Sequence, residues 1–134
     1  MSEDIDARIA ELGLQLPPPL ALPPDARLPF PWVRIHGNRA FVSGHGPQDM
    51  VGRMAAPLGK VGTELSLEEG YLAARQTGLT ILGSLQRELG TLNRVTAWLK
   101  VLGMVNTAPG FNQMPAVING FTDLIIEVFG EARG

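Results

Sequence analysis

The sequence predicts an α+β domain in which two long helices cover one face of a mixed β-sheet. Three observations predict it: helical spacing of apolar residues in 66–89 and 115–129, a hairpin pattern in 32–43, and strand-like alternation in 91–105. With 134 residues, 45% apolar and 18% charged, a single domain spanning 1–134 is expected. The uncovered sheet face is expected to meet a partner.

Residues 1–31 are expected to form a short helix followed by a proline-rich arm. Ser2 is the predicted helix cap and Gly13 the predicted stop, with one apolar stripe between them formed by Ile5, Ile9 and Leu12. Prolines from Pro17 to Pro31 prevent both a helix and a central strand. We interpret the arm as an extended connector, and a partner-binding segment is the alternative.

The hairpin is predicted between Trp32 and Ser43, with Gly37-Asn38 as its two-residue turn. A glycine- and proline-rich stretch, SGHGPQDMVGRMAAPLGKVG, follows as the expected functional loop. Ser66 and Glu69 then form a capping-box pattern that opens the first long helix, and Gly90 is its predicted end.

Two glycines inside that helix, Gly78 and Gly83, predict a close approach to the sheet. The next strand is predicted within 91–105, where Val95, Ala97, Leu99 and Val101 point to one face and Trp98 and Lys100 to the other. Apolar residues from Val117 to Val128 predict the second long helix, with Gly130 as its end.

Composition excludes several classes of function. The chain has no cysteine, so disulfides, thiolate catalysis and zinc-thiolate sites are excluded, and two histidines do not predict a metal site or a cofactor. A net charge of -2 with scattered basic residues makes nucleic acid an unlikely partner. The acidic amphipathic N-terminus and the short apolar runs predict neither a signal peptide nor a membrane span, so a cytoplasmic location is expected.

Three strings of the sequence are distinctive: LGLQLPPPLALPP from Leu12, NRAFVSGHGP from Asn38, and FNQMPAVINGFTDLIIEVFGEARG from Phe111. Together they resemble the YjgF/Rid family, also described as reactive intermediate deaminases or endoribonuclease L-PSP-like proteins. The first string is typical of one branch of that family. The resemblance implies a fold like that of the trimeric chorismate mutase: a homotrimer whose sheets form a central barrel, with small-molecule clefts between subunits.

The resemblance also implies an activity and a set of site residues. Deaminases of the family hydrolyse enamines and imines to keto acids and ammonia. Ser43 matches a family serine that faces the cleft, Trp32 stands where deaminases have a tyrosine, and Asn119 and Thr122 lie near a family asparagine. Family members continue into strands that carry a carboxylate-binding arginine and a glutamate. This sequence ends at Gly134, before both, so the C-terminal strands are expected to be missing.

Each candidate residue has a plainer interpretation. Ser43 fits a satisfied structural hydroxyl equally well, and it is no triad nucleophile without suitably placed partners. His45 is a candidate for proton transfer to a bound imine, against an exposed loop histidine. Arg34 is a candidate for binding a carboxylate, against a solvated surface charge. Trp32 fits a pocket wall or an interface core.

Two functions therefore stand beside each other. One is an enamine or imine hydrolase with Ser43 and His45 as catalytic residues and Trp32, Arg34, Asn119 and Thr122 as ligand-binding residues. The other is a non-catalytic trimer that binds a small carboxylate or imine. Ribonuclease activity ranks last, because the chain is acidic and lacks aromatic side chains along a basic groove.

Overall fold

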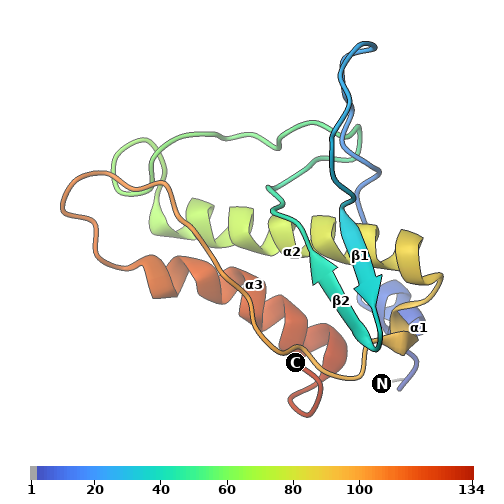
Figure 1. Cartoon of the computed structure of the whole chain (residues 1–134). Coiled ribbons are helices and arrows are strands. Elements are labelled where there is room, and N and C mark those ends of the chain that lie inside the picture. The colour runs from blue at the N-terminus through green and yellow to red at the C-terminus, as the bar shows by residue number, and fades with distance from the viewer. Residues whose placement is uncertain (1–2) are drawn as a thin grey trace.

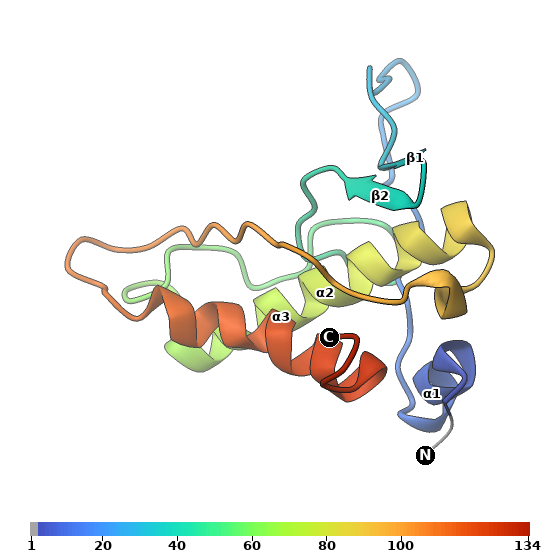
Figure 2. The same cartoon turned by 60° about the horizontal axis from the view of Figure 1, so that its bottom comes forward.

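A computed structural model describes residues 3–134, which form three α-helices, one 3₁₀ helix and a two-stranded sheet (Figure 1). The elements in chain order are α1 (Ile5–Glu11), β1 (Val33–His36), β2 (Arg39–Val42), α2 (Leu67–Leu89), η1 (Leu92–Arg94) and α3 (Met114–Phe129). The helices α2 and α3 pack side by side, and Figure 2 shows the hairpin and the segment 95–106 on the same side of this pair. The predicted α+β class is therefore confirmed.

The mixed sheet predicted for this fold is not formed within the described residues, because the sheet consists of β1 and β2 alone, paired antiparallel. The strand predicted in 91–105 is wrong: its start forms η1, and the remainder has no regular structure. A strand needs a series of backbone hydrogen bonds to a neighbouring strand. This segment forms isolated backbone hydrogen bonds instead, such as the one from the Trp98 N–H to the Arg133 carbonyl at 2.7 Å. Alternation alone therefore could not predict pairing.

The hairpin forms where the sequence predicts it. Val33 pairs with Val42 and His36 with Arg39, so Gly37-Asn38 is a two-residue turn, and Gly37 has the positive φ of 61° that such a turn requires. Strand alternation places Val33, Ile35, Ala40 and Val42 on one face and Arg34, His36, Arg39 and Phe41 on the other. Val33 is the only buried residue of either strand, so the hairpin packs against the rest of the domain mainly at the start of β1.

Both long helices begin and end close to the predicted residues. The capping box between Ser66 and Glu69 is complete, with each side chain bonded to the other residue's backbone N–H, and Gly90 caps α2 with a φ of 82°. Pro115 occupies the first turn of α3, where a missing N–H costs little, and Gly130 follows its last residue. These confirmed boundaries come from local chemistry.

The internal glycines of α2 were predicted to approach the sheet. In the structure they approach α3 and the proline-rich arm instead. A Cβ built on Gly78 would lie 2.7 Å from Leu124 Cδ2 of α3. One built on Gly83 would lie 2.9 Å from the Pro17 carbonyl of the arm. The prediction of close approach is thus confirmed and its partner corrected: the glycines let a helix and the arm come near α2.

The helix α1 is capped by Asp4, whose carboxylate accepts the Ala7 N–H at 3.1 Å. The predicted cap Ser2 lies outside the described residues. Gly13, with a φ of 68°, follows the C-cap residue Leu12 as expected.

Asp6 fastens α1 to the turn that follows α2. Its carboxylate accepts hydrogen bonds from the Thr91 hydroxyl, from the Leu92 N–H at 3.1 Å and from Gln86 Nε2 at 3.3 Å. We expect Asp6→Ala to lower the free energy of unfolding by about 2 kcal/mol, because three donors lose their acceptor. Urea denaturation measures this loss. Asp25→Ala, on the exposed arm, should change stability little, and an equal loss in both variants would contradict this account.

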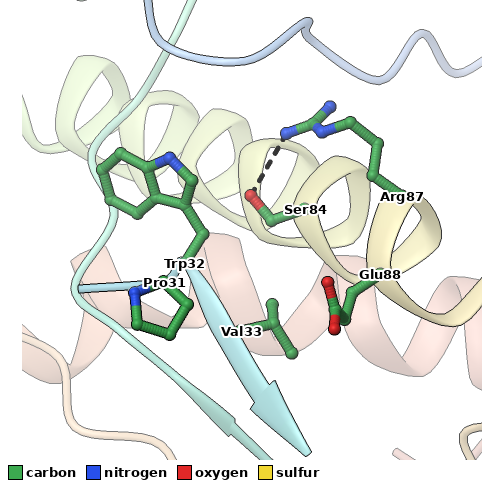
Figure 3. A pocket seen from close by; sticks show the side chains of 6 residues that line it. All are labelled: Pro31, Trp32, Val33, Ser84, Arg87 and Glu88. Carbon is green, nitrogen blue, oxygen red and sulfur yellow. Dashed lines mark hydrogen bonds between the residues drawn. The ribbon is translucent and has the colours of Figure 1, made fainter. Parts of the chain in front are cut away.

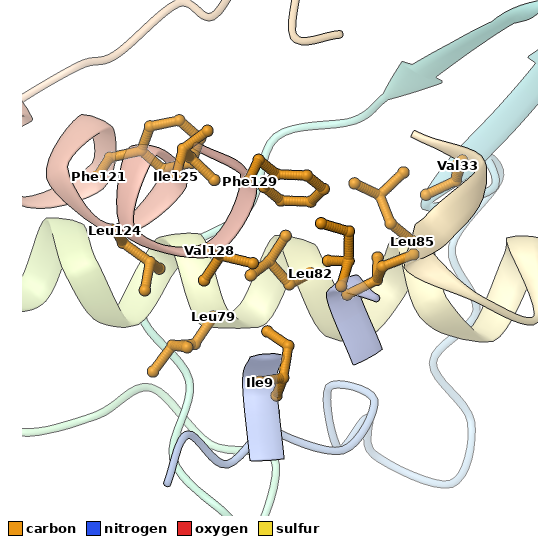
Figure 4. Close-up of a cluster of buried hydrophobic side chains, with 12 residues drawn as sticks. Ile9, Val33, Leu79, Leu82, Leu85, Phe121, Leu124, Ile125, Val128 and Phe129 are labelled. Atoms are coloured by element: carbon orange, nitrogen blue, oxygen red, sulfur yellow. The ribbon is translucent and has the colours of Figure 1, made fainter. Parts of the chain in front are cut away.

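The main hydrophobic core lies between α2, α3 and α1, and Figure 4 shows its side chains interdigitating. Fully buried members come from all three helices and from η1, and they include Ile5, Leu82, Leu92, Leu124 and Val128. Val33 brings the hairpin to the edge of this cluster. The core therefore fixes the C-terminal half of α2 against the start of β1, which positions the site described next.

Candidate functional site

A small cavity lies between the start of the hairpin and the C-terminal half of α2. Its volume is about 160 Å³, and it is lined by Pro31, Trp32 and Val33 on one side and by Ser84, Arg87 and Glu88 on the other. Figure 3 shows the Trp32 ring across from the side chains of Ser84 and Arg87. One apolar wall thus faces one polar wall.

The loop that follows β2 runs along α2 and is held there by polar contacts. Gln76 Nε2 donates to the Gln48 carbonyl at 2.5 Å, and the Gln48 N–H donates to the Thr80 hydroxyl at 3.1 Å. One turn further along α2, Ser84 meets His45. Because residues four apart share a helix face, Gln76, Thr80 and Ser84 form one polar ridge that aligns the loop.

His45 is held at both ring nitrogens. Its Nδ1 lies 2.6 Å from the Ser43 carbonyl oxygen and its Nε2 lies 2.8 Å from Ser84 Oγ. Because a carbonyl only accepts, Nδ1 must carry a proton, and in the neutral ring Nε2 then accepts the Ser84 hydroxyl proton. The ring also packs against Trp32, with centroids 4.9 Å apart. The contacts therefore select one tautomer and one orientation.

Burial lowers the pKa of His45 below its ordinary value of 6.5; the hydrogen bond to Ser43 opposes this, and the charge of Arg87 adds to it. The unfolded chain thus binds more protons than the folded one between the lowered pKa and 6.5. The contribution of neutral His45 to the free energy of unfolding is therefore fully present above pH 6.5, and it is lost as the pH falls through the lowered pKa.

We therefore expect the free energy of unfolding of the wild type to fall below pH 6.5 more steeply than that of His45→Gln, whose amide does not titrate. Urea denaturation between pH 4.5 and 8 measures both curves. His36→Gln, which removes an exposed histidine of the hairpin, should follow the wild-type curve. Parallel curves for the wild type and His45→Gln would contradict the expected effect.

Arg87 supplies the positive charge of the cavity. Its Nη1 donates to the Pro17 carbonyl at 3.1 Å and its Nη2 to Ser84 Oγ at 3.2 Å. Within the described residues, the guanidinium forms no ion pair; the single ion pair found there joins Arg75 and Glu127 across α2 and α3. Partial burial lowers the pKa of Arg87. The cation is held in place by neutral oxygens and is available to an anion.

The predicted site residues divide into two groups. Ser43, His45 and Trp32 come together: the Ser43 hydroxyl donates to the Pro31 carbonyl at 2.8 Å, and its own carbonyl holds His45. Arg34 lies on the opposite face of β1 from the cavity-lining Val33. Asn119 and Thr122 lie on the exposed side of α3, where the Thr122 hydroxyl donates to the Asn119 carbonyl at 3.3 Å. None of these last three lines the cavity.

Sequence reasoning missed Ser84 and Arg87. The available signal was a row of polar residues, Gln76, Thr80, Ser84 and Arg87, spaced four, four and three apart along one face of the helix. Such a row on one face of a helix indicates polar contacts with another segment.

A second, larger hollow of about 420 Å³ lies between the loop 47–57 and the N-terminal half of α2. Both carboxylates that line it already accept hydrogen bonds from backbone N–H groups: Asp49 from Val51 and Arg53, and Glu69 from Ser66. Residues 3–134 hold no cluster of three or more His, Asp or Glu that could bind a metal. No helix in that range is long and apolar enough to cross a membrane.

The fold and the comparison with family models identify the class of protein: the chain belongs to the family described as "YjgF/chorismate mutase-like, putative endoribonuclease", whose model matches residues 6–134. The resemblance seen in the sequence is thereby confirmed, together with the chorismate-mutase-like fold.

Particular relatives match over most of their length. Protein TCP17 of Trypanosoma cruzi is 35% identical over 130 residues, which are 97% of this chain and 78% of that protein. A crystal structure titled "putative endoribonuclease" from Shewanella oneidensis MR-1 has a TM-score of 0.85 and 28% identity, covering 96% of this chain and 82% of that one. The protein Atu1372 from Agrobacterium tumefaciens, titled as of unknown function, has a TM-score of 0.81 and 30% identity, covering 97% and 77%.

Proposed function

We propose that this protein binds a small carboxylate metabolite in the cavity between Trp32 and α2 and hydrolyses an enamine or imine there. The observation that carries the proposal is that His45 and Arg87 both contact Ser84: an anion-binding group lines the cavity, and a neutral acid-base group lies directly behind the cavity-lining hydroxyl. Arg87 would bind the carboxylate, and Trp32 would cover the flat face of the ligand.

The chemistry needs a proton donor and a water molecule. An enamine becomes an imine when its β-carbon takes up a proton; water then adds to the C=N carbon, and ammonia leaves as the keto acid forms. His45 Nε2 carries no proton in the neutral ring, so solvent supplies the β-carbon proton. A proton of the attacking water would then pass through the Ser84 hydroxyl, which lines the cavity, to His45 Nε2 and return by the same route to the departing nitrogen. The Ser43 carbonyl stabilises the imidazolium that forms transiently.

The test combines turnover and binding. Freshly generated 2-aminoacrylate should release ammonia faster in the presence of the protein, and His45→Gln should remove at least about 100-fold of the acceleration. Pyruvate should raise the melting temperature in a concentration-dependent way. Arg87→Gln should abolish that shift, whereas Arg27→Gln, the same charge change on the exposed arm, should retain it. No shift in the wild type would overturn the proposed site.

A non-catalytic binding protein is the alternative, and the same experiment separates the two: a pyruvate shift lost in Arg87→Gln, without any acceleration at high protein concentration, favours binding alone. The similarity to the Shewanella oneidensis protein, described as a putative endoribonuclease, suggests RNA as a further ligand. We rank it last, because a net charge of -2 provides no continuous basic surface for phosphates.

We also propose that the protein assembles as a homotrimer. Leu99, Leu102 and Met104 expose 77%, 81% and 87% of their surface on the segment 95–106, and Phe41 exposes 56% on the adjoining layer. Exposed apolar side chains of this kind favour burial between subunits. In such an assembly Arg34, Asn119 and Thr122 would reach a ligand only from a neighbouring subunit.

Sedimentation equilibrium should give three times the chain mass, and Leu102→Asp should weaken association. A monomer at all concentrations would overturn this proposal.

A further inference from the structure

Ser84 differs from the two threonines of α2 in where its hydroxyl proton points. Thr77 and Thr80 each donate to the carbonyl four residues earlier, Ala73 at 2.9 Å and Gln76 at 3.0 Å. This is the usual way to satisfy a hydroxyl inside a helix. Ser84 instead directs its single proton at His45 Nε2, 2.8 Å away, because that nitrogen is the acceptor of the fixed tautomer. Its hydroxyl is therefore polarised by a base.

The three groups form the sequence nucleophile, base and orienting acceptor. Ser84 Oγ contacts His45 Nε2, and His45 Nδ1 contacts the Ser43 carbonyl oxygen at 2.6 Å. In serine hydrolases a carboxylate fills the third position; here a backbone carbonyl performs the same two tasks, fixing the tautomer and stabilising the imidazolium. The packing of Trp32 against the ring holds the base in this orientation.

A positive donor stands beside the nucleophile. Arg87 Nη2 lies 3.2 Å from Ser84 Oγ, so an oxyanion that develops on an attacked carbonyl next to Oγ would form within reach of this guanidinium. Ser84 is only 5% exposed, yet it lines the cavity, so a reagent reaches it only through a partly apolar space.

We propose that Ser84 is a nucleophilic serine and that the protein hydrolyses small acyl esters through it. Ser84 Oγ bonds to the acyl carbon while its proton moves to His45 Nε2, and the oxyanion collapses as Nε2 protonates the departing alcohol. Water then attacks the acyl-serine, gives its proton to Nε2, and releases the acid as the Ser84 hydroxyl is restored. The net reaction is ester plus water to acid plus alcohol.

The cavity limits the acyl group. A volume of about 160 Å³ is well below the roughly 300 Å³ at which drug-sized ligand pockets begin, so the substrate class is esters of short acyl chains. Pro31, Trp32 and Val33 supply an apolar wall for the chain. This activity requires no imine and stands apart from the function proposed above.

The decisive test is covalent labelling of the wild-type protein with a small fluorophosphonate, with the modified peptide located by mass spectrometry. We expect the label on Ser84, its loss in Ser84→Ala, and a labelling rate at least about 100-fold lower in His45→Gln. Thr77→Ala, which removes a hydroxyl two turns away on the same helix, should label at the wild-type rate. Hydrolysis of p-nitrophenyl acetate should follow the same order.

The absence of label on the wild-type protein, or label on another residue, would overturn the proposal, and neither outcome depends on how well a variant folds. The result also separates the two proposals. A shift in melting temperature with pyruvate, without any reaction with the fluorophosphonate, would support the proposed metabolite site and contradict the nucleophilic role of Ser84. Labelling of Ser84 without a shift in melting temperature would support the nucleophilic role and contradict the proposed metabolite site.

Discussion

Gly120→Ala is expected to destabilise the protein by about 3 kcal/mol or more, which is the largest effect we foresee for adding one methyl group. A Cβ built on Gly120 would lie 1.9 Å from the Tyr71 carbonyl oxygen and 2.8 Å from the Tyr71 carbonyl carbon. These are backbone atoms of α2, so no side-chain rotation relieves the clash. The helices α2 and α3 would have to separate where they pack most closely.

Urea denaturation of Gly120→Ala against the wild type measures this loss. Gly44→Ala is the matched control, because a Cβ built there meets nothing within 4 Å and its φ does not lie in the positive range. The loss should also weaken the links that cross the same interface, such as the hydrogen bond of 2.7 Å from the Tyr71 hydroxyl to Asp123. A loss below about 1 kcal/mol would show that the helices approach less closely than described.

Leu124→Ala is expected to cost about 3 kcal/mol, because the side chain is fully buried at the centre of the helix interface and its removal leaves a cavity. The same side chain restricts a second position. A Cβ built on Gly78 would lie 2.7 Å from Leu124 Cδ2, so Gly78→Ala alone should cost about 1–3 kcal/mol through overpacking.

The two changes should compensate each other. In the double variant, the new methyl at position 78 occupies part of the space left by Leu124, so the combined loss should be smaller than the sum of the single losses by at least about 1 kcal/mol. Phe121, whose Cδ2 lies 3.2 Å from the built Cβ, limits the compensation. Additive losses across this double-mutant cycle would contradict the packing of Leu124 onto Gly78.

The elements with local signals were predictable. The capping box at Ser66, the proline at the start of α3 and the Gly37-Asn38 turn each depend on atoms within a few residues, so the sequence alone indicates them. The prediction of a strand in 91–105 was wrong because pairing is not local. Alternation describes the two faces of an extended segment, but pairing depends on a neighbouring strand elsewhere in the chain.

The candidate site was predictable only in part. Ser43, His45 and Trp32 lie close together in the chain, between positions 32 and 45, and the resemblance to the family indicates this region as part of the site. Their geometric roles were not foreseeable: the hydroxyl of Ser43 is bound to Pro31, and its carbonyl holds the histidine instead. The role of Arg34, Asn119 and Thr122 in binding a ligand stays a prediction that depends on the proposed homotrimer.

By itself, the sequence determined the α+β class, the two long helices and the hairpin, because periodicity, caps and turn residues act over short distances, and the resemblance of three strings indicated the family. The tertiary structure alone decided which polar groups meet. His45 and Ser84 are 39 residues apart in the chain, and they come together because the apolar core orients α2 so that its polar ridge faces the loop after β2. Burial of apolar side chains specifies that orientation, and no local pattern records which polar side chain it will bring to the histidine.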